Sequence, residues 1–414
     1  MKPKPKKQPN KQGVAFDYIK ENYLDSDRLR HDEISDQVQI QNADGTWRDF
    51  TTKDIHDIVV NCSLESGVAI TVKEVQAVTL SNHVPTVHPL RDYVMSCGEN
   101  QMLYDPSKPN CPDWIDWFAQ FVTVEGSEEE QQFWRKSFKK WFVAMVASWL
   151  NPDVANHQVL VLIGKQGVGK TTWLDHLLPP QLRAYNSKMH INAYMNKDEK
   201  LRVAEFGLIN IDEIDTITSN RALNMVKSLI TATDVDERAA WRYNKEKRTR
   251  IASFCASGNN PQFLTDLTGN RRWLVFTAMH ILSPLNMTIP YENIYAQAYY
   301  LYQHGFQYWF DQDENNKLDE HNEDYRDQPN EEQLIPRHLR VPLQGEEGEF
   351  LSTAAISSLL QDRERIKTPL TTSRLAMLLR KAGFQEKRTA HARGFVVIVI
   401  SSQEANKPQK VVTE

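Results

Sequence analysis

The sequence predicts an α/β protein whose main domain is a parallel sheet flanked by helices. Three apolar runs with strand character, Val159–Ile163, Phe206–Ile211 and Ile251–Ala256, are separated by helical or loop sequence, and a fourth, Trp273–Phe276, follows them. Strands that alternate with helices favour a parallel sheet, because each parallel connection needs a crossover. A glycine-rich segment directly after the first run supports the same fold class.

The composition limits the classes of protein to consider. A chain of 414 residues predicts two or three domains. Its net charge of −5 predicts neither a nucleic-acid binder nor a membrane binder, so local charge matters more. The apolar runs fall short of the roughly 18 residues of a membrane span, and the lysine-rich start precedes no apolar stretch. We expect a cytoplasmic protein with no membrane partner.

Changes in composition along the chain predict six segments. They are a basic tail (1–12), an N-terminal accessory α+β domain (13–125), the main α/β domain with a preceding helix (126–312), an acidic linker (313–345), a C-terminal domain (346–402) and a tail (403–414). In the accessory domain, Asp44-Gly45 between alternating residues is typical of a hairpin turn. The acidic run with prolines soon after it is typical of solvated linker sequence.

Two helices frame the main domain. Between Glu128 and Leu150, aromatic residues recur at intervals of three and four, which predicts a helix that buries a broad aromatic stripe. The segment Tyr291–Phe310, rich in tyrosine and alanine, is interpreted as a second helix. We expect the aromatic stripe of the first helix to be core.

The C-terminal domain is predicted to be a winged helix. Helix starts at Ser352-Thr353 and Thr371-Thr372 precede two strands, Gln385–Thr389 and Gly394–Ile400, which a basic loop joins. DNA binding by this domain is expected through Arg374, Lys387 and Arg388, with Arg380, Lys381 and Arg393 nearby. A protein-docking or capping domain is the alternative.

The segment from Gly164 to Thr171 fits the pattern G-x-x-x-x-G-K-[ST] between a strand and a helix. Its glycines allow backbone N–H groups to surround phosphates, Lys170 reaches the β and γ phosphates, and Thr171 offers a hydroxyl to Mg²⁺. We therefore expect ATP and Mg²⁺ as cofactors. The residues expected to bind the nucleotide are Gly164, Lys165, Gln166, Gly167, Val168, Gly169, Lys170, Thr171 and Thr172.

Polar residues follow the next two strands. Asp212 and Glu213 end the second apolar run, where Asp212 is expected to hold Mg²⁺ and Glu213 to orient or deprotonate the attacking water. Asp215 is interpreted as structural or as support for basic neighbours. Asn259, after the third run, is expected to touch the γ phosphate or the water, although asparagine is also common in ordinary turns.

Two basic segments complete the candidate site. Arg271-Arg272 precedes the fourth strand, where AAA+ ATPases place a positive charge at the subunit boundary. Either arginine is a candidate, and an ordinary structural ion pair is the alternative. The basic and aromatic run from Arg238 to Arg250 suits contact with single-stranded DNA, although charge runs are often solvated faces. Its candidate DNA contacts are Arg238, Arg242, Lys245, Lys247 and Arg248.

With these motifs, the chain resembles the virulence-associated protein E family, helicase-like ATPases of phages and mobile genetic elements that resemble superfamily 3 helicases. The segment Asn259–Trp273 is close to the family's N-x-x-x-F-L-x-D-x-T-G-N-R-R-[FW] signature. His88–Tyr93 and Ala296–Phe310 resemble the segments on either side of its ATPase domain. The chain departs from the family's Arg-x-Pro-Tyr element, since it has Arg238-Ala239-Ala240-Trp241.

The resemblance implies an AAA+ type core in a homo-hexameric ring that moves on single-stranded or forked DNA. The first hundred residues contain no primase-like motif, so a separate primase would supply any priming. The leading hypothesis is an ATP-dependent DNA helicase of a replication module. The alternative is a nucleotide-switched ATPase that loads or remodels a protein partner without unwinding DNA. A small-molecule kinase fits badly, because Asn259 and the arginine pair would then have no role.

Overall fold

The computed structural model describes residues 10–191, 197–217, 220–237, 246–264, 270–326, 330–343, 345–364, 372–388 and 393–400. The chain forms two compact units, Met1–Tyr325 and Arg326–Glu414. Across the described ranges, no helix combines the length and the apolar character that crossing a bilayer requires. The two ends of the chain, 1–9 and 401–414, lie outside the described residues, as do the shorter gaps between these ranges.

The first unit begins with a small sheet packed against helices. Its elements are α1 (Lys11–Ile19), η1 (Lys20–Leu24), β1 (Leu29–Asp32), β2 (Gln37–Gln41), β3 (Trp47–Asp49), α2 (Thr52–Ser66), α3 (Val72–Thr79) and β4 (Thr86–Val87). The strand order is β3-β2-β1-β4. The predicted hairpin is confirmed: Gly45 has a φ of +84°, and the Asp44 carboxylate accepts a hydrogen bond of 2.9 Å from the Thr46 amide. Glycine takes this φ without strain.

The next two helices pack on the main domain instead of on the small sheet. They are α4 (Pro89–Glu99) and α5 (Trp114–Ala119), and a short strand, β5 (Val122–Val124), follows. Leu90, Val94 and Phe118 are fully buried in the same core as Trp134 and Phe276. The accessory domain with a core of its own therefore ends near β4, before the expected boundary at residue 125.

A six-stranded sheet forms the centre of the unit, in the order β5-β12-β6-β11-β8-β7. Its other strands are β6 (Val159–Ile163), β7 (Asn186–Met189), β8 (Leu208–Ile211), β11 (Ser253–Gly258) and β12 (Trp273–Ile281). All neighbouring pairs are parallel except β12 with β5. The four strands predicted from apolar runs are thus confirmed. Their carboxyl ends meet at one edge, as in every parallel sheet.

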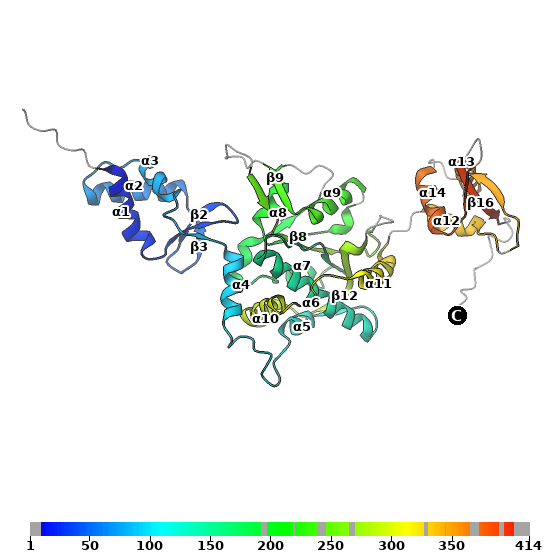
Figure 1. Cartoon of the computed structure of the whole chain (residues 1–414), viewed down its shortest axis with the longest axis horizontal. Coiled ribbons are helices and arrows are strands. Elements are labelled where there is room, and N and C mark those ends of the chain that lie inside the picture. The colour runs from blue at the N-terminus through cyan, green and yellow to red at the C-terminus, as the bar shows by residue number, and fades with distance from the viewer. Residues whose placement is uncertain are drawn as a thin grey trace, which may run out of the picture. The chain divides into compact units, whose positions relative to one another are not determined.

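Helices cover both faces of this sheet, which gives a mixed α/β architecture (Figure 1). Along β6, Leu160 and Leu162 enter the core on one face, whereas Val159 and Ile163 enter the core on the other. This alternation follows from the two-residue period of a strand. The other elements of this part of the chain are α6 (Glu128–Leu150), α7 (Lys170–Asp175), η2 (Pro180–Tyr185), α8 (Lys197–Glu205), η3 (Ile214–Thr216), α9 (Asn220–Thr231), the hairpin of β9 (Asp234–Glu237) and β10 (Glu246–Thr249), η4 (Asn270–Arg272), η5 (Pro284–Asn286) and α10 (Tyr291–Gln303).

The α6 helix has the bounds that the aromatic spacing predicts, Glu128–Leu150. Its aromatic stripe is core: Trp134, Phe138 and Trp141 are fully buried, and Trp149 is nearly so. The Trp134 indole donates a hydrogen bond of 2.9 Å to the Ala119 carbonyl, which satisfies its polar atom. Aromatic side chains of this size contribute a large share of the buried apolar area.

The predicted acidic linker (313–345) is wrong over most of its length, because its first part is helical in the first unit, and Asn330–His338 and Leu339–Arg340 form a helix and a strand of the second. Residues 312–322 form the helix α11 (Gln312–Asn322), followed by η6 (Glu323–Tyr325). Its acidic residues are used in contacts, because Glu314 pairs with Lys136 at 2.8 Å and with the buried Lys140 at 2.6 Å. Leu318 is fully buried in the main core. A high acidic content does not keep a helix solvated when a neighbouring helix supplies lysines.

The second unit is a small sheet with three helices. Its elements are α12 (Asn330–His338), β13 (Leu339–Arg340), β14 (Glu349–Ser352), α13 (Thr353–Glu364), α14 (Thr372–Lys381), β15 (Glu386–Arg388) and β16 (Arg393–Val399). The strand β16 pairs antiparallel with β13, β14 and β15. The helix start at Ser352-Thr353 and the hairpin of the last two strands are confirmed, whereas Thr371 and the hairpin tip lie outside the described residues.

Candidate functional site

The loop between β6 and α7 has the backbone that its glycines predict. Gly164, Gly167 and Gly169 have φ values of +152°, +86° and +99°, a region that other residues rarely adopt. A Cβ added to Gly164 would lie 2.5 Å from the Ala278 carbonyl oxygen on β12. The first glycine is therefore required both for its dihedral angle and for close packing against the neighbouring strand.

Lys170 lies beneath this loop with its amine directed at polar oxygens. Its Nζ donates to the carbonyl oxygens of Gly164 at 2.7 Å and Lys165 at 2.9 Å, and to Oδ1 of Asn259 at 3.2 Å. The side chain is buried, which lowers the pKa of its amine, while the charges of Asp215 and Asp212 oppose this shift. A charged amine buried at a loop of this kind is placed to contact phosphate oxygens.

Asp212 is the centre of a cluster of oxygen atoms at the ends of three elements. Its Oδ1 accepts hydrogen bonds from the Ser257 hydroxyl at 2.7 Å and from the Thr171 hydroxyl at 3.3 Å, and the two hydroxyl oxygens are 3.1 Å apart. Magnesium prefers oxygen ligands, and it often uses one carboxylate together with a P-loop hydroxyl. This donor set fits the predicted metal residues, Thr171 and Asp212. Ser257, at the end of β11, is a third oxygen donor of this cluster, and the sequence did not predict it.

Glu213 is exposed and has a φ of +54°, in the left-handed region. A non-glycine residue in this region carries a strain of about 1 kcal/mol or more, so the surrounding turn must enforce it. Its position directly after Asp212 places it at the rim of the same site. Strained backbone of this kind is common at functional sites.

Asp215, in η3 after β8, holds the turn after β11 that contains Asn259. Oδ2 of Asp215 accepts hydrogen bonds from the backbone amides of Asn259 at 3.1 Å and Asn260 at 2.9 Å. This fixes the backbone from which the Asn259 side chain reaches Lys170. The structural role predicted for Asp215 is therefore the one it has, with backbone amides as its partners.

These residues surround one cavity of about 340 Å³ at the carboxyl edge of the sheet. Its lining consists of Gln166, Gly167, Gly169, Lys170, Thr171, Thr172, Asp212, Glu213, Ser257, Gly258 and Asn259. Ligands in open α/β sheets bind at this edge. The structure thus brings together most of the predicted nucleotide residues with Asp212, Glu213 and Asn259.

The arginine pair lies elsewhere. Arg271 and Arg272 are in the short helix η4, where Arg271 is exposed, and neither belongs to the lining that the described residues give this cavity. The Asn322 side chain, which is fully buried on α11, donates hydrogen bonds to the carbonyl oxygens of Asn270 at 2.9 Å and Trp273 at 2.8 Å. These bonds hold the turn that carries the two arginines.

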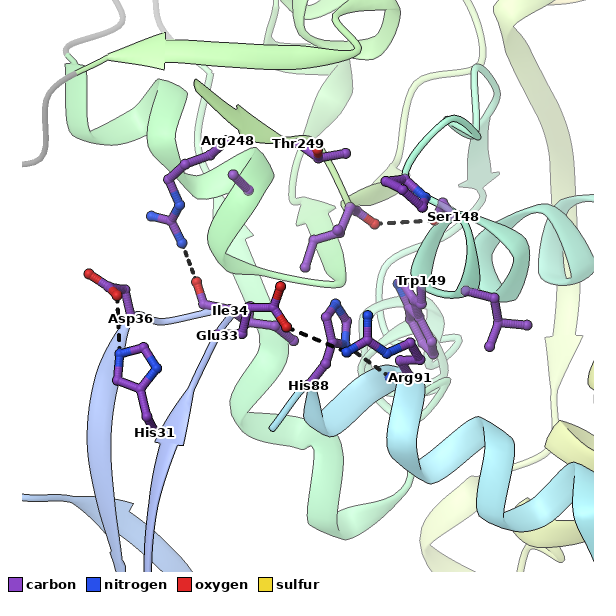
Figure 2. A pocket seen from close by; sticks show the side chains of 14 residues that line it. His31, Glu33, Ile34, Asp36, His88, Arg91, Ser148, Trp149, Arg248 and Thr249 are labelled. Carbon is purple, nitrogen blue, oxygen red and sulfur yellow. Dashed lines mark hydrogen bonds and ion pairs between the residues drawn. The ribbon is translucent and has the colours of Figure 1, made fainter. Parts of the chain in front are cut away.

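One predicted DNA contact, Arg248, has partners within the chain. Arg248, on β10, pairs with Glu205 at 2.9 Å and donates to the Ile34 carbonyl oxygen of the accessory domain. Figure 2 shows Arg248 reaching Ile34 beside a cavity of about 420 Å³. The Glu33–Arg91 and His31–Asp36 pairs also line this cavity. The side chain is therefore used within the chain, because two acceptors lie within its reach. Of the other residues predicted in this run, Arg238, Arg242 and Lys245 lie outside the described residues, as does the side chain of Lys247.

In the second unit, the basic residues fall into two groups. Arg380 and Arg393 both bind the Glu386 carboxylate, and these contacts lower the pKa of Glu386 to about 2. Lys387 and Arg388 are exposed on β15, and Arg374 is partly exposed on α14. The three predicted DNA contacts of this unit are thus accessible, whereas the arginines near them are engaged in ion pairs.

Fold and site together define a mixed α/β protein with a G-x-x-x-x-G-K-[ST] loop at the end of a parallel strand. The profile of the virulence-associated protein E-like domain matches residues 112–327, which is more than half of the chain, and the chain belongs to this family. The resemblance drawn from the motifs is thereby confirmed. None of the curated proteins matches.

Among solved structures, two of the C-terminal region of NrS-1 are similar to the chain. One, spanning residues 305–718 of that protein, has 12% identity and a TM-score of 0.42, and the match covers 93% of this chain and 99% of the other. The other, an A form, has 12% identity and a TM-score of 0.43, with 93% and 100% coverage. Scores of this size carry no argument about mechanism.

Proposed function

We propose that the chain is an ATP-dependent DNA helicase or translocase of a phage or mobile-element replication module. The observation that carries the proposal is the convergence of Lys170, Thr171, Asp212 and Asn259 on one cavity. A buried amine, a carboxylate with two hydroxyls, and an amide at the next strand end are the groups that bind and hydrolyse a nucleoside triphosphate. Membership of the virulence-associated protein E-like family supports the replication context.

Each group has a distinct task in this proposal. Positive-φ glycines turn loop amides toward the phosphates, and Lys170 neutralises charge on the β and γ phosphates. Thr171 and Asp212, with Ser257, would hold Mg²⁺, which neutralises the charge that develops on the phosphate oxygens. Glu213 orients the attacking water and accepts its proton, and Asn259 positions the γ phosphate or the water.

The remaining elements belong to assembly and to DNA. An arginine that is exposed in one chain and outside the cavity lining suits action on a neighbouring chain, so Arg271 or Arg272 would complete the site in a homo-hexameric ring. The second unit, with two helices before a two-stranded hairpin, is proposed to be a winged helix that contacts forked DNA through Arg374, Lys387 and Arg388. We place this activity in the cytoplasm, with any primase on a separate chain.

A second candidate is a nucleotide-switched ATPase that loads or remodels a protein partner without unwinding DNA. The observation that favours it is the use of Arg248, a predicted DNA contact, to bind Glu205 and the accessory domain. Continuous turnover is favoured instead by Glu213, because a switch needs no efficient catalytic base.

The experiment is the ATPase rate of the full chain with and without single-stranded DNA, paired with unwinding of a forked duplex. Stimulation by single-stranded DNA together with strand separation is the expected result. ATP hydrolysis that DNA leaves unchanged, without unwinding, supports the second candidate. Failure to bind Mg·ATP at all overturns both.

A further inference from the structure

The strand order predicts how a triphosphate lies across the sheet in this cavity. In the order β5-β12-β6-β11-β8-β7, Asn259 follows β11, and Asp212 and Glu213 follow β8, so all three residues come from strands on one side of β6. The proposed water-activating and metal-binding groups act at the γ phosphate, so that phosphate lies toward β11 and β8. The nucleoside end of a bound triphosphate then leaves the loop on the opposite side of β6, toward β12 and β5.

The end of β12 runs alongside the loop on that side. The Ala278 carbonyl oxygen is so close to Gly164 that no Cβ would fit there, and the Ile281 Cβ is 3.9 Å from a Cβ built at Gly169. Val168 packs against the same core that contains Ile281. The backbone from residue 278 to 281 therefore flanks the loop from its first glycine to its last.

Within this stretch the strand register is irregular, and apolar side chains are exposed. The β12–β5 register shifts between Ala278 and His280, so Met279 is the extra residue. Bulges of this kind redirect a side chain and are common next to active sites. The side chains of Met279 and Leu282 are 57% and 45% exposed, and the Leu282 amide donates a hydrogen bond of 2.8 Å to the Phe121 carbonyl, which fixes its backbone.

We propose that Met279 and Leu282 form the surface that binds the adenine base of the nucleotide. This inference rests on the proposed function, because the direction of the triphosphate defines where the base lies. A thioether and a branched aliphatic side chain pack well on the face of a purine ring, and the thioether adds a favourable sulfur–aromatic contact.

The apolar exposure extends along the chain beyond these two residues. Leu285 and Met287 are 68% and 45% exposed. A second copy of the chain could cover this whole stretch in a ring, and that is the competing occupant. The base is the occupant we argue, because Met279 lies within the stretch 278–281 that flanks the loop and Leu282 directly follows it, whereas Leu285 and Met287 lie farther along the chain. The two occupants can be distinguished, because a base covers the surface only when ATP is bound, whereas a second copy covers it without ATP.

The test compares Mg·ATP with Mg·tripolyphosphate, which has the phosphates but no base, by titration calorimetry on the full chain. In the double variant Met279→Ala, Leu282→Ala, the Kd for ATP should rise about tenfold, equivalent to about 1.4 kcal/mol, while the Kd for tripolyphosphate stays unchanged. The matched control, Leu64→Ala with Met102→Ala, removes a leucine and a methionine side chain that are exposed elsewhere and should change neither Kd.

Several outcomes would overturn the assignment. An unchanged Kd for ATP in the double variant would overturn it, and so would an equal loss of affinity for ATP and for tripolyphosphate. An unchanged Kd for ATP together with a smaller assembly, measured by light scattering, would assign the surface to a second copy of the chain. If the wild-type chain binds no ATP, the proposed function itself fails, and this inference fails with it. Should the double variant melt early, Met279→Gln, which keeps the side-chain length and adds a polar amide, gives the same comparison.

Discussion

The Tyr185 hydroxyl donates a hydrogen bond of 2.8 Å to Oδ2 of Asp32, which joins residues 153 positions apart. Asp32 is fully buried and ends β1 of the accessory domain, whereas Tyr185 precedes β7 of the central sheet. The same carboxylate accepts from the Ile34 amide at 2.9 Å and the Ser35 hydroxyl at 2.7 Å. Burial and the neighbouring Asp32 charge raise the pKa of Tyr185, so the phenol stays a donor.

Tyr185→Phe should therefore lower the free energy of unfolding by about 1–3 kcal/mol, because it leaves a buried carboxylate one hydrogen bond short. Urea unfolding at neutral pH measures the change. The control is Tyr302→Phe, at a partly exposed position on α10, which should change the free energy by less than about 0.5 kcal/mol. Equal losses in the two variants would mean that the contact between Tyr185 and Asp32 does not stabilise the chain.

Lys170→Ala should weaken Mg·ATP binding by at least about a hundredfold, the equivalent of two charge-assisted hydrogen bonds to phosphate. Calorimetric titration gives the Kd, and thermal unfolding shows whether the fold survives the loss of the contacts to the loop carbonyls. Lys53→Ala, at an exposed position on α2, is the matched control and should bind like the wild type. Wild-type affinity in the Lys170 variant would rule out the assignment of this amine to the phosphates.

Glu213→Gln should bind Mg·ATP with nearly unchanged affinity and hydrolyse it about 10²–10⁴ times more slowly, since it keeps the shape of the side chain and loses the base. Steady-state phosphate release measures the rate, and Glu65→Gln on the exposed face of α2 is the control. A variant that loses binding while its residual turnover stays normal would contradict the role of Glu213 as the base.

Removing both Arg271 and Arg272 should cost about 10³–10⁵ in hydrolysis rate, because an arginine finger is worth far more than a surface ion pair. Mixing the Arg271→Ala, Arg272→Ala double variant with Lys170→Ala should restore part of the activity, since some interfaces then join an intact loop to intact arginines. ATPase rate across mixing ratios, with particle size measured in parallel, is the readout. Full activity in a strictly monomeric preparation, or no recovery from variants that assemble, counts against action on a neighbouring chain.

Glu314 should make stability depend on pH in acid. Burial alone would raise the pKa of Glu314, but hydrogen bonds from Lys136 and Lys140 lower it to about 2, below its ordinary value of 4.5. A lowered carboxyl pKa gives stability that is present above pH 4.5 and is lost as the pH falls toward 2. Glu314→Gln should therefore lower the free energy of unfolding by about 1–3 kcal/mol at pH 7, and the difference should shrink toward pH 2. A difference that stays constant over this range would contradict the ion pairs.

Residues whose role depends on their sequence neighbours could be predicted, whereas residues whose role depends on a contact distant in the sequence could not. The conformation of the glycines from Gly164 to Gly169 follows from their dihedral preference, and the strands around them follow from apolar runs. Both signals are visible in the sequence alone. Ser257 was missed because one serine at a strand end is common, and only its contact with Asp212 distinguishes it. The aromatic stripe of α6 was predictable because helical periodicity repeats over its whole length.

The partners of charged residues were the hardest feature to predict from the sequence. Arg248 and Arg250 belong to one basic run, yet Arg248 pairs with Glu205 and Arg250 is buried among carbonyl oxygens, where burial lowers its pKa to about 9. Glu314 lies in an acidic run and is paired with two lysines of α6. Composition cannot separate a solvated charge from a paired one, because the partner is more than 40 residues away in the chain for Arg248 and more than 170 for Lys140 with Glu314.

The two hydrogen bonds from Asn322 define the shortest fragment that can keep the proposed nucleotide site together with an ordered Arg271-Arg272 turn. The glycine-rich loop and the acidic pair both precede the end of β11, and a truncation after β12 would preserve the whole central sheet. Such a fragment would lack α11, and with it the amide that fixes the carbonyl oxygens of Asn270 and Trp273 on either side of the arginine pair. It would retain a nucleotide cavity and lose the orientation of the arginines. The part of the chain that carries the proposed ATPase site therefore extends to η6, at Tyr325, and does not end with the last strand of the sheet.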